Sequence, residues 1–249
     1  MRAQPLRPPR ATLNIAKLDA AGAEMFCRHP AVCRLRGFLS AEECAHFKEV
    51  GRVGMKRADV MGDDKTIKMK GRTNSHAWFR HDHDPVFKAV ADRIAALVGI
   101  PLSHAEEFQL IWYRSREQYK AHLDGFDVET KAGRDSWRYG GQRVATALAY
   151  LNTVEQGGGT GFPKLKLTVP AEAGTLCVFQ NTLPHSSLRH PDSLHAGLPV
   201  VSGEKWAFNL WFREADRRTQ PPFPPQVRKF QGGRQSSLGN AILSQRHQR

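Results

Sequence analysis

The sequence predicts an α+β fold in which a helical layer packs against an antiparallel sheet or barrel. Helical periodicity is confined to the part of the chain before residue 100, and from Phe108 onward the apolar pattern changes to a period of two. The chain has 249 residues, of which 40% are hydrophobic, so it can bury a sizeable core. Sandwiches and barrels of this length still form one domain. Helices followed by short strands are typical of the α+β class.

The first predicted helix follows a short apolar stretch at residues 32–39. Ser40 and Glu43 have the spacing of a capping box, in which each side chain accepts a hydrogen bond from the other residue's backbone N–H. A helix over about 41–52 is therefore expected. Residues 53–76 are polar and rich in Gly, Lys and Asp, which predicts a loop or an irregular hairpin.

The second predicted helix begins at Asp84-Pro85, a favourable cap and first-turn pair, and ends before Gly99. Its apolar residues recur at helical spacing: Phe87, Val90, Ile94 and Leu97. This spacing predicts one buried face on the helix.

Four strand-like runs carry the period-two pattern in the second half of the chain. They lie at residues 108–113, 144–152, 175–179 and 205–214. Loops that contain glycine and proline separate them, at 157–163, 169–174 and 191–199. Short strands joined in this way predict an antiparallel sheet.

Three parts are expected along the chain: an N-terminal extension over 1–25, one domain over 26–216 with its core at about 105–215, and a basic, disordered tail over 217–249. The net charge of +13 is concentrated at the two ends, and no acidic residue follows Asp216. Such a tail is expected to attract polyanions or an acidic protein in a salt-dependent way. A solubilising disordered end is the alternative.

No run approaches the roughly 18 uncharged apolar residues that a membrane-spanning helix needs, so no membrane segment and a cytoplasmic location are expected. The basic start of the chain is more typical of a disordered extension than of an organelle transit peptide. Cys27, Cys33, Cys44 and Cys177 lack CxxC spacing. They are expected to be reduced thiols that pack as small apolar residues.

The most informative motif is His122-x-Asp124. Because side chains alternate along a strand, the histidine and the aspartate point to the same side and can hold one metal ion. Such a triplet also arises by chance, as a solvated surface pair. A third ligand has to come from elsewhere, and His185, His190 and His195 are the candidates.

Lys205 opens the last apolar strand, on the same face as Asn209 and Trp211. A lysine that opens an inward face beside a metal site can anchor a substrate carboxylate. The alternative is a lysine at a strand end that keeps its ammonium group in water.

The stretch 109–214 resembles the catalytic domain of the prolyl 4-hydroxylase family of iron(II)- and 2-oxoglutarate-dependent dioxygenases. The matching motifs, in chain order, are Tyr113, Tyr119, His122-x-Asp124, Arg143-x-x-Thr146, Tyr150-Leu151-Asn152, Gly157-Gly158-Gly159-Thr160-x-Phe162-Pro163, Val169-Pro170, the run 174–179, His195-x-x-x-Pro199-Val200 and Gly203-x-Lys205-Trp206. One departure is that residues 114–118 replace the family's glycine-rich turn between the two tyrosines. That segment borders the substrate mouth, so the departure concerns substrate choice and leaves the metal ligands unchanged.

The resemblance implies a double-stranded β-helix, a jelly roll of two antiparallel sheets flanked by N-terminal helices. In the family the distal histidine lies ten residues before the lysine, which selects His195 as the third ligand beside His122 and Asp124. The implied metal is Fe(II), with 2-oxoglutarate and O2 as co-substrates and ascorbate as reductant. Two imidazoles and one carboxylate on one face of an octahedral iron leave adjacent positions open for these molecules.

The resemblance also implies roles for residues around the metal. Lys205 would pair with the far carboxylate of 2-oxoglutarate, because an unpaired buried carboxylate is expensive. Tyr113 would contribute a hydroxyl to the same molecule, with help from Thr146. Arg143 would lie near the substrate entrance and Trp211, which faces inward, would wall the pocket, although both can equally be packing residues.

The implied reaction hydroxylates an unactivated C–H bond, with a peptidyl proline of a peptide or protein as the expected target. A free amino acid or another small molecule is an alternative, because substrate-selecting residues lie on loops. The basic ends raise a nucleic-acid demethylase of the same superfamily, but those enzymes typically anchor 2-oxoglutarate with arginine. A non-catalytic barrel used as a binding module is least expected, since the three ligands and the lysine are all present. The sequence sets no expectation of oligomeric state.

Overall fold

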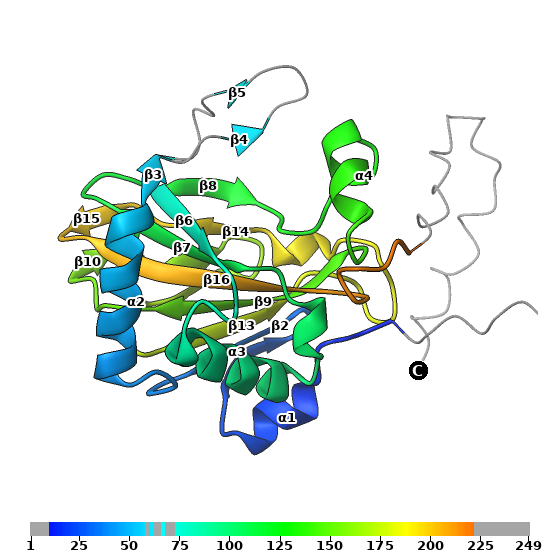
Figure 1. Ribbon diagram of the computed structural model, residues 1–249, viewed down its shortest axis with the longest axis horizontal. Coiled ribbons are helices and arrows are strands. Elements are labelled where there is room, and N and C mark those ends of the chain that lie inside the picture. The colour runs from blue at the N-terminus through cyan, green and yellow to red at the C-terminus, as the bar shows by residue number, and fades with distance from the viewer. Residues whose placement is uncertain (1–9, 58–59, 62–65, 68–72, 222–249) are drawn as a thin grey trace, which may run out of the picture.

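A large antiparallel sheet forms the centre of the computed structural model, which describes residues 10–57, 60–61, 66–67 and 73–221. The strand order of this main sheet is β1-β2-β13-β9-β16-β7-β6-β3 (Figure 1). The strands are β1 Glu24–Arg28, β2 Ala31–Leu35, β13 Leu176–Gln180, β9 Arg143–Tyr150, β16 Lys205–Arg213, β7 Phe108–Tyr113, β6 Ser75–Phe79 and β3 Lys56–Arg57. The four predicted strand runs are confirmed as β7, β9, β13 and β16.

A smaller sheet of four strands, in the order β12-β11-β14-β8, packs against one face of the main sheet. Its strands are β12 Leu167–Val169, β11 Thr160–Phe162, β14 His195–Gly197 and β8 Tyr119–His122. Two short two-stranded pairs complete the strands: β10 Gln156–Gly157 with β15 Val200–Ser202, and β4 Val60–Met61 with β5 Thr66–Ile67. A cluster of buried residues joins the two larger sheets, in which Phe162 and Val169 meet Leu148 and Phe179.

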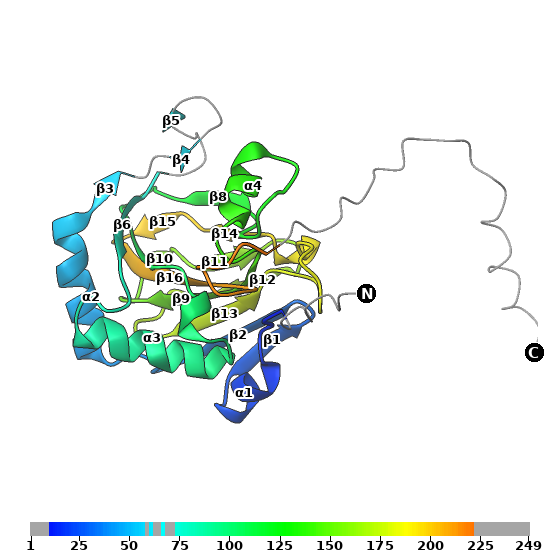
Figure 2. The same cartoon turned by 45° about the vertical axis from the view of Figure 1, so that its right-hand side comes forward.

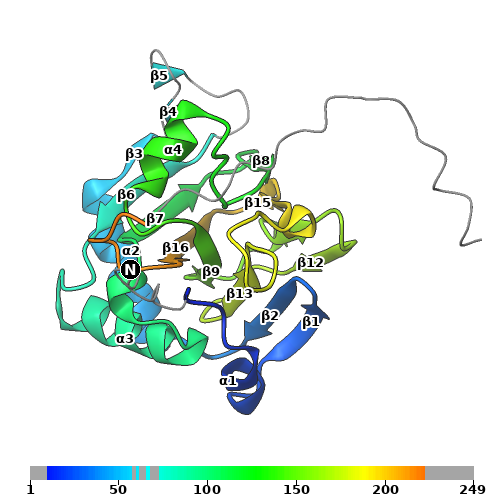
Figure 3. The ribbon, with the colours of Figure 1, turned by 90° about the vertical axis from the view of Figure 1, so that its right-hand side faces the viewer.

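The two long helices, α2 and α3, cover the opposite face of the main sheet (Figures 1 and 2). Helix α2 spans Ala41–Gly54 and α3 spans Pro85–Val98, and both predictions are confirmed. The short helices are α1 Ile15–Ala20 and α4 Lys131–Trp137, with 3-10 turns at Leu102–His104 and Pro191–Ser193. Figure 3 shows α1 beside β1 and β2. Apolar side chains of α2 and α3, such as Phe47 and Phe87, are fully buried against the sheet.

The two long helices begin and end as their sequences dictate. The capping box is present, with the Glu43 N–H donating to Ser40 Oγ and the Ser40 N–H donating to Glu43 Oε2. Asp84 Oδ1 accepts from the first free N–H groups of α3, at 2.8 and 3.0 Å. Gly99 ends α3 with a φ of 70°, a left-handed conformation that glycine adopts at little cost.

The described residues at both ends of the predicted domain pack against it. Within the expected N-terminal extension, Leu18 of α1 is fully buried and the Ala11 N–H donates to the Glu214 carbonyl. Beyond the expected boundary at 216, the Trp137 indole donates to the Pro221 carbonyl at 3.2 Å. Residues 1–9, 222–249 and most of 58–72, on which the remaining predictions for the ends and the irregular hairpin fall, lie outside the described part.

Two further expectations concern membranes and cysteines. Within the described ranges, none of the helices has the length and apolar character needed to cross a bilayer. All four cysteines carry free thiols, and Cys33, Cys44 and Cys177 are buried. Burial raises the pKa of Cys33 to about 12, so this thiol stays protonated and packs as an apolar group.

Candidate active site

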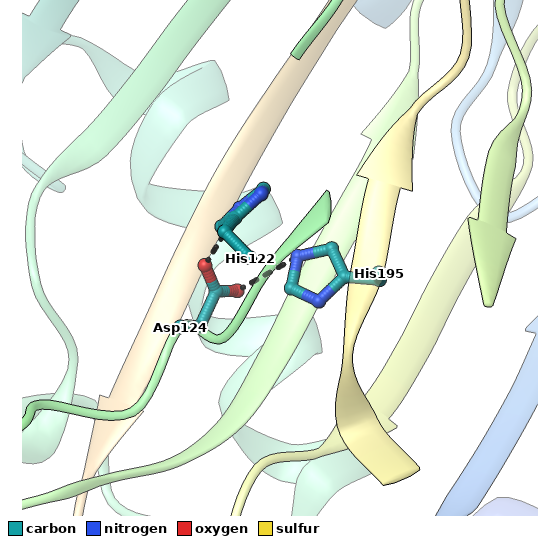
Figure 4. Close-up of side chains that lie close together, drawn as sticks. All are labelled: His122, Asp124 and His195. Atoms are coloured by element: carbon teal, nitrogen blue, oxygen red, sulfur yellow. Dashed lines mark ion pairs between the residues drawn. The ribbon is translucent and has the colours of Figure 1, made fainter. Parts of the chain in front are cut away.

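Three side chains from the smaller sheet converge in one place. His122 is the last residue of β8, Asp124 follows it by two positions, and His195 is the first residue of β14. The antiparallel register sets His195 directly opposite His122. Each histidine Nε2 lies 3.5 Å from one oxygen of the Asp124 carboxylate, and all three potential ligand atoms lie within 4.8 Å of one another (Figure 4).

Backbone contacts fix the tautomer of both histidines. His122 Nδ1 lies 2.8 Å from the Lys120 carbonyl, and His195 Nδ1 lies 2.9 Å from the Ser193 carbonyl. Because a carbonyl oxygen only accepts, both Nδ1 atoms carry the proton and donate. Nε2 is therefore the ring nitrogen of each histidine that faces Asp124 and that can bind a metal ion.

The protonation states also suit a metal site. Burial lowers the pKa of His195 to about 4, so this imidazole is neutral at pH 7. Burial opposes ionisation of Asp124, but His195, His122 and the Arg143 guanidinium outweigh it and hold the pKa of Asp124 well below its usual range. The cluster therefore offers the Asp124 carboxylate and, at His195, a neutral imidazole.

Two hydrogen bonds from the main sheet orient the carboxylate of Asp124. Thr146 of β9 donates its hydroxyl to Oδ2 at 2.7 Å, and Trp211 of β16 donates its indole N–H to the same oxygen at 2.8 Å. The Asn181 amide donates to Thr146 Oγ1 at 2.8 Å, which makes the network continuous. Asp124 thus follows a strand of the smaller sheet, but residues of the main sheet hold its carboxylate in place.

The sequence placed Thr146 near 2-oxoglutarate and Trp211 in the wall of the pocket. Trp211 does line the pocket described below, whereas the hydroxyl of Thr146 is directed at Asp124. Of the three candidate distal histidines, the structure brings His195 to the cluster. His190 instead accepts from the Asp192 N–H at the start of a 3-10 turn.

Arg143 lines the same pocket but has an acidic partner of its own. Its guanidinium donates to both oxygens of the buried Glu106, at 2.6 and 2.7 Å, and Arg213 donates to the same carboxylate. The guanidinium carbon lies 3.9 Å from the centre of the Trp211 ring. Arg143 therefore helps to hold the Trp211 ring in place, and both side chains form part of one wall of the pocket.

Lys205 is a buried cation within the same pocket, with only 2% of its surface exposed. Its ammonium lies 5.3 Å from the Tyr113 ring centre and 5.2 Å from that of Tyr150. Among the described residues no carboxylate forms an ion pair with it. Burial lowers the pKa of Lys205 to about 7, and a carboxylate that entered the pocket would favour the charged form of this lysine.

The pocket that contains these groups has a volume of about 380 Å³. Along the main sheet its floor runs from Lys205 and Tyr113 at one end to Trp211 at the other. The smaller sheet supplies the opposite wall, with the three clustered ligands, Tyr119, Thr160 and Gly197. The metal-binding cluster and the buried cation therefore share one enclosed space.

The donor set fits a non-haem iron site. Two imidazoles and one carboxylate form the facial arrangement that leaves positions open for substrate and oxygen. Sequence reasoning missed Glu106 and Asn181, which lie just before β7 and just after β13 and leave no local pattern. It also missed Trp78, a pocket residue of β6 that stands in an otherwise ordinary strand.

Comparison with known proteins agrees with this geometry. Residues 108–213 match the family model described as the 2OG-Fe(II) oxygenase superfamily. Prolyl 4-hydroxylase 5 of Arabidopsis thaliana is 32% identical over 211 residues, which covers 76% of this chain and 70% of the relative. The viral collagen prolyl hydroxylase of Paramecium Bursaria Chlorella virus-1, solved in complex with 2OG, is 27% identical with a TM-score of 0.61, and the match covers 76% of this chain and 99% of that one.

A prolyl-4-hydroxylase of Pseudomonas putida shares the fold with a TM-score of 0.53, at 19% identity and with 80% of this chain and 97% of that one covered. These likenesses confirm the double-stranded β-helix that the sequence motifs implied. The chain belongs to the prolyl 4-hydroxylase family of Fe(II)- and 2-oxoglutarate-dependent dioxygenases.

Proposed function

We propose that this dioxygenase hydroxylates a prolyl residue of a peptide or protein. In this proposal His122, Asp124 and His195 hold Fe(II), and Lys205 receives the far carboxylate of 2-oxoglutarate. The observation that carries it is that an open three-ligand cluster and a buried lysine line one pocket, and that no carboxylate of the described residues pairs with this lysine. The names of the similar proteins, which are prolyl hydroxylases, support proline as the target.

Bound iron would supply the coupling between oxidative decarboxylation of 2-oxoglutarate, which gives succinate and carbon dioxide, and hydroxylation of a C–H bond. The protein's own contribution is orientation. The backbone carbonyls that bind the two Nδ1–H groups hold both imidazoles in one tautomer, and Thr146 and Trp211 fix the carboxylate of Asp124. A site held in this way needs little rearrangement when ligands enter.

The other end of the pocket discriminates between co-substrates by charge. A dicarboxylate satisfies the Lys205 ammonium, whereas a monocarboxylate leaves it buried and unpaired. Tyr113, which is buried and lies against the lysine, is proposed to contribute its hydroxyl there. Arg143 and Trp211 are proposed to form the wall that the substrate passes.

Two finer points belong to the same proposal. Ascorbate is the proposed reductant that keeps the iron in its ferrous state. The basic residues after Asp216 support a salt-dependent contact with an acidic protein or another polyanion. Both points can be tested separately from the chemistry.

The decisive experiment measures succinate release with Fe(II), ascorbate and 2-oxoglutarate against proline-containing peptides, free amino acids and a methylated oligonucleotide. Products are analysed by mass spectrometry for the addition of one oxygen atom. We expect turnover with peptides and hydroxylation on proline. Turnover with free amino acids or demethylation of the oligonucleotide, without peptide hydroxylation, would overturn the proposal.

A matched pair of variants tests the ligand assignment. His195→Ala should abolish turnover and strongly weaken metal binding while the fold survives, because it removes one of three ligands. His185→Ala, in the adjacent loop, is the control and should retain both properties. The reverse result would show that the distal ligand has been assigned to the wrong histidine.

A further inference from the structure

Trp78 stands at the end of a row of pocket residues that crosses the main sheet. It pairs with Gln109 on β7, Gln109 pairs with Asn209 on β16, and Asn209 pairs with Leu148 on β9. All four side chains line the pocket that holds the metal-binding cluster. Trp78 is therefore placed by sheet register, and its side chain faces the same space as the reacting groups.

Trp78 differs sharply from Trp211 in its exposure. Trp78 is 43% exposed and Trp211 is 5% exposed, although their ring centres are only 5.9 Å apart and their planes differ by 37°. Trp211 is held by its bond to Asp124 and by the Arg143 guanidinium on its face. The two rings are thus in contact, with Trp211 buried beside Asp124 and Trp78 at the rim of the pocket.

A half-exposed tryptophan at the rim of a pocket has unsatisfied apolar surface. Its ring can be covered by a flat or compact apolar group, and the negative face of the π system attracts polarised C–H bonds. A proline ring offers both properties, because its C–H groups next to the amide nitrogen are electron-poor. A charged side chain would instead lose hydration on such a surface.

The separation of the two rings sets the spacing along a bound peptide. An extended or polyproline chain rises roughly 3.1–3.3 Å per residue, so two residues span about 6 Å. The ring centres of Trp78 and Trp211 are 5.9 Å apart. A peptide whose target residue enters the pocket beside Trp211 therefore passes Trp78 with a residue about two positions away.

We infer that Trp78 forms an outer subsite that binds an apolar residue, most favourably a second proline, two positions from the prolyl residue that is hydroxylated. The inference rests on the proposed function, since it takes a peptide as substrate. It adds a sequence preference that the metal site cannot create. It also gives β6 a role in substrate selection beside its role in the sheet.

The test compares Trp78→Ala, Trp78→Phe and Tyr139→Ala on three peptides. One peptide has prolines two positions before and after the target, and each of the other two has one of these prolines replaced by aspartate. Tyr139 is the matched control, an aromatic residue that is 58% exposed and lies outside the pocket. For each enzyme we measure KM and kcat for the peptide, together with the midpoint of a 2-oxoglutarate titration.

Trp78→Ala should raise KM for the doubly proline-containing peptide on the order of tenfold, with little change in kcat. The wild-type preference for proline over aspartate at the relevant position should disappear in this variant. Trp78→Phe should retain most of the preference, and Tyr139→Ala should resemble the wild type. An unchanged 2-oxoglutarate midpoint in Trp78→Ala would show that the co-substrate end of the pocket is intact.

Two negative outcomes are distinguishable. If the wild type prefers neither proline, or if Trp78→Ala keeps the wild-type preference, the outer subsite is refuted while prolyl hydroxylation stands. If the wild type hydroxylates none of the peptides but turns over another substrate, the proposed function itself fails. A parallel rise of KM for all three peptides in Trp78→Ala would also refute the subsite, because it would indicate a general disturbance of the pocket.

Discussion

Replacing Lys205 with methionine should stabilise the ligand-free protein and at the same time abolish binding of 2-oxoglutarate. Methionine keeps most of the length and apolar volume of lysine but removes the charge. The pKa of Lys205 is lowered from 10.5 to about 7 by burial. Burying the Lys205 ammonium therefore costs free energy in the folded protein, whereas in the unfolded chain the same group is hydrated.

The size of this stabilisation follows from the shift. One pKa unit corresponds to about 1.4 kcal/mol, so a pKa that falls from 10.5 to about 7 lowers the free energy of unfolding by about 4 kcal/mol at pH 7. Between pH 7 and pH 10 the unfolded chain binds more protons than the folded one, so wild-type stability should rise with pH in this window. The Lys205→Met variant should have a higher free energy of unfolding than the wild type at pH 7, and this free energy should not rise further with pH through loss of the Lys205 proton.

The same change should have the opposite effect on the co-substrate. A buried carboxylate that loses its charged partner costs roughly 3–5 kcal/mol, or about two to four orders of magnitude in affinity. Iron should still bind, because His122, Asp124 and His195 are untouched. Titration of 2-oxoglutarate into iron-loaded protein, followed by the visible charge-transfer band, measures the loss.

Urea unfolding of the metal-free protein measures the predicted stabilisation of the Lys205→Met variant. Lys88→Met is the matched control, because the Lys88 side chain is 50% exposed and paired with Asp92 on the surface of α3, where such pairs contribute little. The reasoning fails if Lys205→Met is less stable than the wild type at pH 7. It also fails if the variant binds 2-oxoglutarate with an unchanged midpoint.

Three further predictions follow from the site and the domain ends. The affinity for 2-oxoglutarate should be nearly constant below pH 7 and fall about tenfold per pH unit above it, because the Lys205 ammonium is lost there. Lys205→Arg, whose charge persists, should bind with a flat profile in titrations from pH 6 to 9, and a flat wild-type profile would contradict the assignment. Thr146→Val removes one hydrogen bond to Asp124 and should weaken metal binding about tenfold, as measured by titration with Fe(II) or Co(II); equal affinities would exclude an orienting role. Truncation after Pro221 should leave the unfolding midpoint unchanged, whereas truncation after Asp216 should lower it through loss of the indole hydrogen bond, and equal midpoints would place the domain boundary at 216.

Local signals in the sequence predicted the elements that local physics determines. The capping pair Ser40 and Glu43 and the cap at Asp84 located both long helices, and the alternation along 205–214 assigned Lys205 and Trp211 to the inner face. Helix α4 was missed because it has only seven residues, too few for a periodic signal. Short elements that depend on tertiary packing could not be predicted from the hydrophobic periodicity of the sequence.

The site divides in the same way. The spacing of His122 and Asp124 is local, and the third ligand required a family pattern to separate His195 from its neighbours. The partners of Asp124 could not be predicted, since Thr146 and Trp211 approach from the other sheet, 22 and 87 residues away. The pairing of Arg143 with Glu106 likewise joins β9 to the segment before β7, 37 residues away.

The carboxylate of Asp124, held by both sheets, determines the order of events when the protein is made. Its hydrogen bonds to β9 and β16 form only after the sheets have closed on each other, because contacts of long sequence separation form late in folding. A zinc finger folds around its metal, whose ligands are close in sequence. In the proposed site the ligands are assembled by the meeting of two sheets, so iron would bind a pocket that the fold has already formed.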